Sequence, residues 1–192
     1  MLINKSNILL SSFVSSLFLV AYFFSISPND ESVRLWTRYS AHLSFIYLLV
    51  AYSAGILSQN FKYPITKQLL KNRRYFGLGF SVTHTFHLAA LIYFFYIRNE
   101  EPTIVTILGG GLGYLLMYAM AITSTDEMVK MVGIKRWKLI HTIGINYLVV
   151  IFFYAFVGAI YQTSIYSIYT IYVLAILIVW GLKISNMVKQ SV

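Results

Sequence analysis

Apolar residues along this chain fall into six long stretches, and the short segments between them hold almost all of the charged side chains. The stretches cover residues 7–26, 39–58, 75–97, 103–123, 139–161 and 164–184. Each is about as long as the roughly 18–20 apolar residues that a transmembrane helix requires. We therefore predict an all-α integral membrane protein, a six-transmembrane-helix bundle that forms a single transmembrane domain over residues 1–192.

The basic residues predict the orientation of this bundle. If the first residue lies inside, twelve Lys and Arg side chains fall on the cytoplasmic face and only Arg34, Arg38 and Arg98 fall outside. The twelve are Lys5, Lys62, Lys67, Lys71, Arg73, Arg74, Lys130, Lys135, Arg136, Lys138, Lys183 and Lys189. Because basic loops resist translocation, this asymmetry predicts cytoplasmic N- and C-termini. The net charge of +9 then follows from topology, and nucleic acid is not an expected partner.

A short polar segment between the fourth and fifth stretches predicts one further helix. Ser124 and Glu127 have the spacing of a capping box, which satisfies free amides at a helix start. Gly133 is a natural stop. We expect a short helix on the inner membrane surface.

Composition narrows the chemistry that such a bundle can carry. Hydrophobic residues make up 58% of the chain and charged residues 11%, so lipid must solvate most of the surface. Cysteine is absent, which excludes disulfides, iron–sulfur clusters and thiolate-ligated haem. Histidine remains the main candidate metal ligand.

The histidines and the carboxylates are segregated along the chain. All four histidines lie within apolar stretches, and all six carboxylates lie outside them. The histidines are His42, His84, His87 and His141; the carboxylates are Asp30, Glu31, Glu100, Glu101, Asp126 and Glu127. A polar side chain within a membrane is costly without a partner. Since no acid lies in the spans to form a proton pair, a metal or haem is the predicted partner.

Depth along the helices suggests how these imidazoles pair. His84 and His87 are three residues apart and project from one helix face. At about 1.5 Å rise per residue they lie near the middle of a span that starts beside Arg73 and Arg74. His84 or His87 could provide one axial ligand of a haem b and His141 the other. The expected iron is haem iron only, without a separate metal site. Whichever of His84 and His87 is left could pair with His42 nearer the outside, which gives one or two haems.

Haem propionates would need cations at the cytoplasmic face, and four basic side chains are suitable. These are Arg73, Arg74, Arg136 and Lys138.

Two motifs give this chain a family resemblance. Residues 72–78 (NRRYFGL) with His87-Leu88, and residues 123–141 (TSTDEMVKMVGIKRWKLIH), resemble two segments of bacterial ferric-reductase-like transmembrane domains. The chain is similar to the haem-binding membrane subunit of the periplasmic methionine-sulfoxide reductase system, over about residues 36–160. The resemblance implies a six-helix bundle that carries b-type haem, with haem-associated histidines at His87 and His141. It also implies electron transfer across the membrane.

The chain departs from the family at one position. The family usually has a further histidine thirteen residues beyond the one in the fifth span, and here that residue is Tyr154. His84 or His42 could take over that role. The sequence has no flavin domain, so the expected electron donor is a separate flavoprotein or a membrane quinol, with a quinone as a further candidate cofactor. The electron acceptor would lie on the outer side.

Three functions remain open from the sequence. The first is an electron-transfer subunit of a ferric-reductase-like oxidoreductase. The second is a small membrane transporter or channel with a histidine-lined path, and the third is a non-catalytic assembly subunit without haem. Histidines that only hydrogen-bond between helices fit the last of these, and His42 fits that description best.

Overall fold

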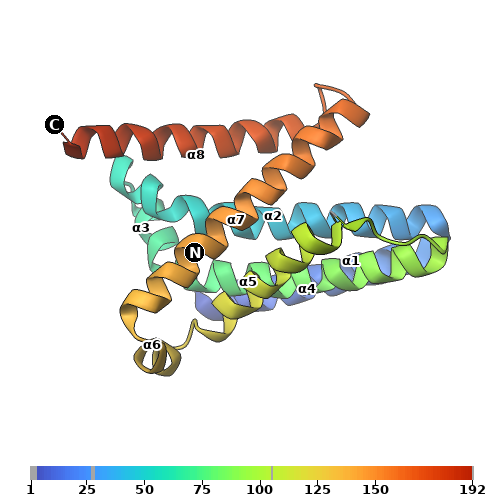
Figure 1. The fold of residues 1–192 in the computed structure, drawn as a ribbon, viewed down its shortest axis with the longest axis horizontal. Helices are drawn as coiled ribbons and strands as arrows, with labels where there is room; N and C mark the ends of the chain where they lie inside the picture. The colour runs from blue at the N-terminus through green and yellow to red at the C-terminus, as the bar shows by residue number, and fades with distance from the viewer. Residues whose placement is uncertain (1–3, 27–28, 105, 192) are drawn as a thin grey trace.

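The chain folds into helices joined by short connections (Figure 1). This computed structural model describes residues 4–26, 29–104 and 106–191. The helices are α1 (Lys5–Ile26), α2 (Asp30–Asn60), α3 (Pro64–Lys71), α4 (Arg73–Arg98), the π-helical turn η1 (Thr106–Gly110), α5 (Gly111–Ile122), α6 (Asp126–Val132), α7 (Ile134–Gln162) and α8 (Ile168–Ser191). No strand occurs among the described residues.

The long helices confirm the predicted membrane fold. Five of them, α1, α2, α4, α7 and α8, are long and apolar enough to cross a membrane. The segment Thr106–Ile122 meets the same criterion only together with α6, which is bent away from it by 106°, so the pair is a sixth span only if it is counted as one element. The five long helices fall on five of the predicted apolar stretches, and Thr106–Ile122 falls on the remaining one, residues 103–123. The long helices run back and forth between two ends, so that α1 begins and α8 ends toward the same end of the bundle (Figure 1).

Helix α2 begins nine residues earlier than the apolar pattern predicted, at Asp30. The reason is a strong cap: the Asn29 side chain accepts from the Ser32 amide at 2.8 Å, and the Ser32 hydroxyl accepts from the Asn29 amide at 3.1 Å. This reciprocal capping satisfies two amides at the helix start and allows a polar first turn to precede the apolar part.

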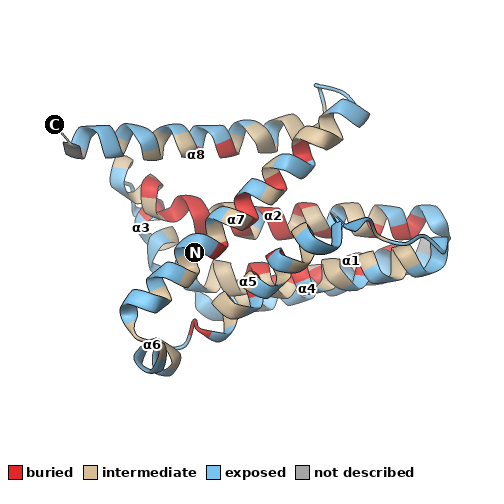
Figure 2. Cartoon of the chain, in the orientation of Figure 1, coloured by how far each residue is buried: buried red, intermediate tan, exposed pale blue. Residues whose placement is uncertain are grey.

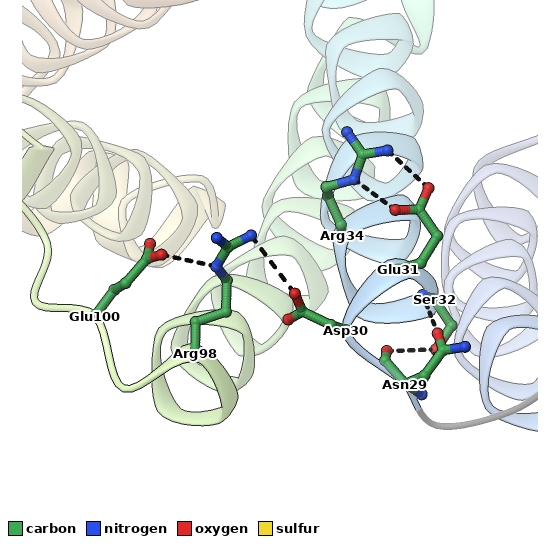
Figure 3. Close-up of polar contacts among 7 residues, drawn as sticks. All are labelled: Asn29, Asp30, Glu31, Ser32, Arg34, Arg98 and Glu100. Carbon is green, nitrogen blue, oxygen red and sulfur yellow. Dashed lines mark hydrogen bonds and ion pairs between the residues drawn. The ribbon is translucent and has the colours of Figure 1, made fainter.

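Exposed ion pairs lie where the start of α2 meets the end of α4 (Figure 3). The Arg98 guanidinium at the end of α4 lies 3.6 Å from Asp30 and 2.8 Å from Glu100. Within the first turn of α2, Arg34 pairs with Glu31 at 2.7 Å. Such exposed pairs contribute at most about 1 kcal/mol each. Their main consequence is electrostatic, because this end of the bundle has nearly balanced charge, whereas the opposite end has a large basic excess.

Helix α2 is the centre of the packing (Figure 2). Its buried residues Phe45 and Leu48 join a core with Phe152 of α7 and Ile176 of α8. The outward faces of the helices instead carry exposed large apolar side chains, such as Phe18, Ile92 and Leu115. A soluble protein would not leave these faces open, and a lipid bilayer covers them at no cost.

The short helices lie at the basic end. The predicted surface helix is present as α6, but its N-cap is Thr125 rather than Ser124: the Thr125 hydroxyl accepts from the Met128 amide at 3.2 Å. The Ser124 hydroxyl instead donates to the Met120 carbonyl, and the helix starts one residue later than its spacing suggested. Gly133 ends α6 with a φ of +85°, as predicted, because glycine adopts that conformation without strain. Helix α3 was not predicted from the sequence.

Candidate functional site

Two histidines of α4 meet two serines of α2 inside the bundle. The Nδ1 atom of His84 lies 3.1 Å from the Ser44 hydroxyl, and the Nδ1 atom of His87 lies 3.0 Å from the Ser40 hydroxyl. The helices are antiparallel (Figure 1), so the pairs form in reverse order along the chain. The two serines are four residues apart and share one face of α2, and the two histidines are three residues apart and share one face of α4. These two faces lie against each other.

The serines lie where they can fix which ring nitrogen of each histidine carries the proton. Besides the imidazole, the Ser40 hydroxyl reaches the Thr37 carbonyl and the Ser44 hydroxyl reaches the Ala41 carbonyl, both at 3.0 Å. A hydroxyl has a single proton. If each serine donates that proton to its carbonyl, its oxygen accepts from the Nδ1–H of the histidine and the imidazole lone pair is left on Nε2, the nitrogen that would then bind a metal.

Aromatic rings surround His84. The centroid of its imidazole lies 4.7 Å from the ring of Tyr114, 4.9 Å from that of Phe80 and 5.4 Å from that of Phe152. His87 stacks on it at 5.1 Å. His84 is buried and His87 is half-buried. The two imidazoles thus form one polar pair within an otherwise apolar and aromatic layer, where water is excluded.

His141 lies in a different environment, near the start of α7. Its Nε2 atom is 3.2 Å from the Thr123 hydroxyl, which itself donates to the Ala119 carbonyl at 2.6 Å. If the threonine proton stays on that carbonyl, His141 donates through Nε2 and keeps its lone pair on Nδ1. Trp137 packs against it with ring centroids 4.4 Å apart.

A cavity of about 510 Å³ opens beside His141 at the basic end of the bundle. This volume is within the range of small-molecule and cofactor sites. Its lining combines apolar side chains such as Phe80 with a set of cations: Arg73, Arg74, Lys138 and Lys183. No carboxylate of the described chain lines it.

Three of the four predicted propionate partners therefore line this cavity. Arg73, Arg74 and Lys138 do so, and Arg136 does not. Arg74 is also paired with Asp126 of α6 at 2.6 Å, through two exposed side chains. The basic residues at the starts of α4 and α7 thus converge on one cavity.

The structure does not bring the four histidines together. His84 and His87 are adjacent on one helix, whereas His141 faces the cavity. His84 does not line that cavity; Phe80, whose ring is 4.9 Å from His84, does. Across the described residues, no three His or acidic side chains gather into a metal-binding group.

The other two sequence candidates lie outside this arrangement. His42 packs among the rings of Tyr169 and Tyr172 of α8, at 5.2 and 5.3 Å, and among those of Tyr39 and Phe156. Tyr154 is 71% exposed, so its side chain points away from the bundle.

Sequence reasoning missed the roles of Ser40, Ser44 and Lys183. The serines had a usable signal, because two polar residues four apart in an apolar helix mark one polar stripe. Lys183 was counted only as a topology charge, although it lies inside the last apolar stretch, within residues 164–184.

Comparison with known proteins gives a distant similarity. The sequence matches no protein-family model, and no solved structure matches it. Over 142 residues, the chain is 31% identical to the magnetosome protein MamZ of Magnetospirillum gryphiswaldense. The match covers 69% of this chain and 21% of MamZ, so the chain spans about a fifth of the length of that relative. The fold and the comparison together support a multi-pass helical membrane protein. It is similar to one segment of a longer bacterial protein.

Proposed function

We propose that this chain is a ferric-reductase-like, b-type haem subunit that transfers electrons across a bacterial inner membrane. The observation that carries the proposal is the contact of His84 and His87 with two serines inside the bundle. Each imidazole meets a serine hydroxyl through Nδ1, so Nε2 is the nitrogen that would bind iron. Hydrogen bonding of the remote ring nitrogen is the usual support of a ligating histidine.

The donor set fits a haem better than a bare metal ion. A bare dication buried in lipid would need neutralising carboxylates, and none lies in the spans. Haem iron needs only axial imidazoles, and its apolar ring suits a site surrounded by aromatic side chains. When bound, haem supplies a one-electron iron couple.

The chain's own residues offer ligands to such a group at two separate places. On α4, His84 and His87 would bind through Nε2, while Ser44 and Ser40 hold the rings through Nδ1. On α7, His141 would bind at the cavity, where Arg74 and Lys138 could pair with propionates. The aromatic layer of Tyr114, Phe80 and Phe152 excludes water, which prevents loss of electrons to solvent species.

The family resemblance and the similarity to MamZ bear on the context of this function. The motifs around residues 72–78 and 123–141 carry the resemblance. MamZ is named as a magnetosome protein, and this chain matches a fifth of it. We propose a separate flavoprotein or quinol as donor and an acceptor at the outer face.

A reduced-minus-oxidised spectrum of the purified full chain tests the proposal. We expect a Soret band and an α-band after dithionite reduction, with one or two haems per chain by pyridine haemochrome. His84→Ala, His87→Ala and His141→Ala should each reduce the haem content, whereas His42→Ala is the matched control and should retain one haem. A colourless protein, or full haem content in all three variants, would refute the assignment.

The alternative functions predict different outcomes of the same experiment. A colourless protein that catalyses metal or proton flux in liposomes would be a transporter. A colourless, inactive protein would be an assembly subunit.

A further inference from the structure

A second hollow lies at the basic end of the bundle, between α2, the start of α4 and α8. Its volume is about 330 Å³. It is lined by Tyr52, Gly55, Ile56, Gln59, Arg73, Lys183, Asn186 and Met187. Two of these are cations and two are amides, and no carboxylate is among them.

Arg73 is positioned by the backbone of α2. Its Nε atom donates to the Ala51 carbonyl at 2.9 Å. That bond fixes the guanidinium plane and leaves both terminal nitrogens free to donate. A planar guanidinium with two free nitrogens matches two oxygens of a phosphate group.

Lys183 is held at the same hollow by an aromatic ring. Its Nζ atom lies 3.2 Å from the centroid of the Tyr52 ring, which is a cation–π contact. The Tyr52 hydroxyl accepts from the Trp180 indole at 2.9 Å and donates to Asn146 at 3.0 Å. Because these two bonds fix the ring, the ammonium group has a defined place beside the hollow.

Neither cation has a carboxylate partner among the residues that the structure describes. Asp126, an acid of the basic end, pairs with Arg74. The pairs of Asp30, Glu31 and Glu100 all lie at the opposite end. Two like charges that line one hollow repel each other, more strongly in a low-dielectric setting than in water. An anion bound between them would remove this cost.

We propose that Arg73 and Lys183 bind the phosphate group of an anionic membrane phospholipid at this hollow. Basic pockets between transmembrane helices on the cytoplasmic side suit such headgroups. The neighbouring Met187 is 65% exposed on the outward face of α8, so acyl chains could run along that helix. Gln59 and Asn186, which are hydrogen-bonded to each other at 3.2 Å, add amide groups at the rim.

The proposal does not depend on haem. Lys183 lines both the larger cavity and this hollow, so the test reads out lipid binding rather than haem content.

Native mass spectrometry of the full chain in detergent, titrated with phosphatidylglycerol, measures the site directly. Lys183→Gln should weaken binding by about tenfold or more, as expected for loss of a charge-assisted contact. Lys189→Gln on the same helix is the matched control and should change the affinity by less than about twofold, because exposed charges are screened. Lys183→Arg keeps the charge and should bind nearly as the original chain does.

A second variant covers the case in which Lys183→Gln does not fold. Asn186→Asp places a carboxylate at the rim of the hollow, on a partly exposed side chain, and should also weaken phosphatidylglycerol binding. Equal affinity of the original chain, Lys183→Gln and Asn186→Asp would overturn the proposal.

Two further probes distinguish the sources of phosphate. Phosphatidylcholine, which has no net charge, should bind more weakly than phosphatidylglycerol, and inorganic phosphate should not displace the lipid. If inorganic phosphate binds in a Lys183-dependent manner and phosphatidylglycerol does not, the lipid assignment is overturned and the ligand is a soluble phosphate.

Discussion

The hydroxyl of Tyr52 joins three helices, and its removal should measurably weaken the bundle. Tyr52 on α2 is 3% exposed. It accepts from Trp180 of α8 at 2.9 Å and donates to Asn146 of α7 at 3.0 Å. Tyr52→Phe removes both bonds and retains the ring, so the change is confined to the hydroxyl.

The two bonds set the expected magnitude. Hydrogen bonds between membrane helices contribute about 0.6 kcal/mol on average and up to about 1.7 kcal/mol. The substitution also leaves the Trp180 indole N–H without an acceptor, and an unpaired buried donor is costly. We expect Tyr52→Phe to lower the free energy of unfolding by about 1–2 kcal/mol.

Reversible unfolding in mixed micelles, followed by circular dichroism, measures this value. A double-mutant cycle with Trp180→Phe should give a coupling energy of at least about 0.5 kcal/mol. Tyr161→Phe, at a position that is 87% exposed, is the control and should have no effect. The reasoning fails if Tyr52→Phe is as stable as Tyr161→Phe, or if the effects of Tyr52→Phe and Trp180→Phe are additive.

Three other predictions use different parts of the molecule. A Cβ at Gly79 would lie 2.8 Å from a tyrosine ring of α2, so Gly79→Ala should lower the free energy of unfolding by about 1–3 kcal/mol. The control Gly77→Ala, whose Cβ would have nothing within 4 Å, should not lower the melting temperature in thermal melts that detect the Gly79→Ala change. If His84 binds haem as proposed, Ser44→Ala should weaken haem binding by about 10–100-fold in haem titrations, because it removes the hydrogen-bond partner of the proposed ligand; unchanged affinity would contradict that role. The chain has no cysteine, so single cysteines map topology: a membrane-impermeant thiol reagent added outside should label Glu101→Cys and not Lys71→Cys, and the reverse pattern would invert the predicted orientation.

Much of the fold could be predicted from the sequence, because each span is a local property. The helix from Arg73 to Arg98 agrees with the apolar stretch 75–97 to within two residues, since an apolar stretch of this length in lipid must satisfy its own backbone. The start of α2 could not be placed in this way, because a capping interaction at Asn29, rather than hydrophobicity, determines it. Helix α3, with eight residues, is too short to leave an apolar stretch in the pattern.

The candidate site was predicted less completely than the fold. The spacing of His84 and His87 placed both on one helix face, and the structure agrees. Pairing with Ser44 and Ser40 depends on the register between α2 and α4, which no local pattern contains. The separation of His141 from His84 by Phe80 also depends on how α4 and α7 pack.

The sequence by itself determined where the apolar segments lie, the segregation of histidines from acids and the charge asymmetry between the two ends. These properties follow from the cost of placing polar groups in lipid, which acts on each segment independently. Only the tertiary structure decided that His84 and His87 meet serines of α2 through Nδ1, and only it brought Arg73 and Lys183 to one hollow. Both results depend on contacts between residues that are far apart in the chain, and such contacts exist only once the helices have packed.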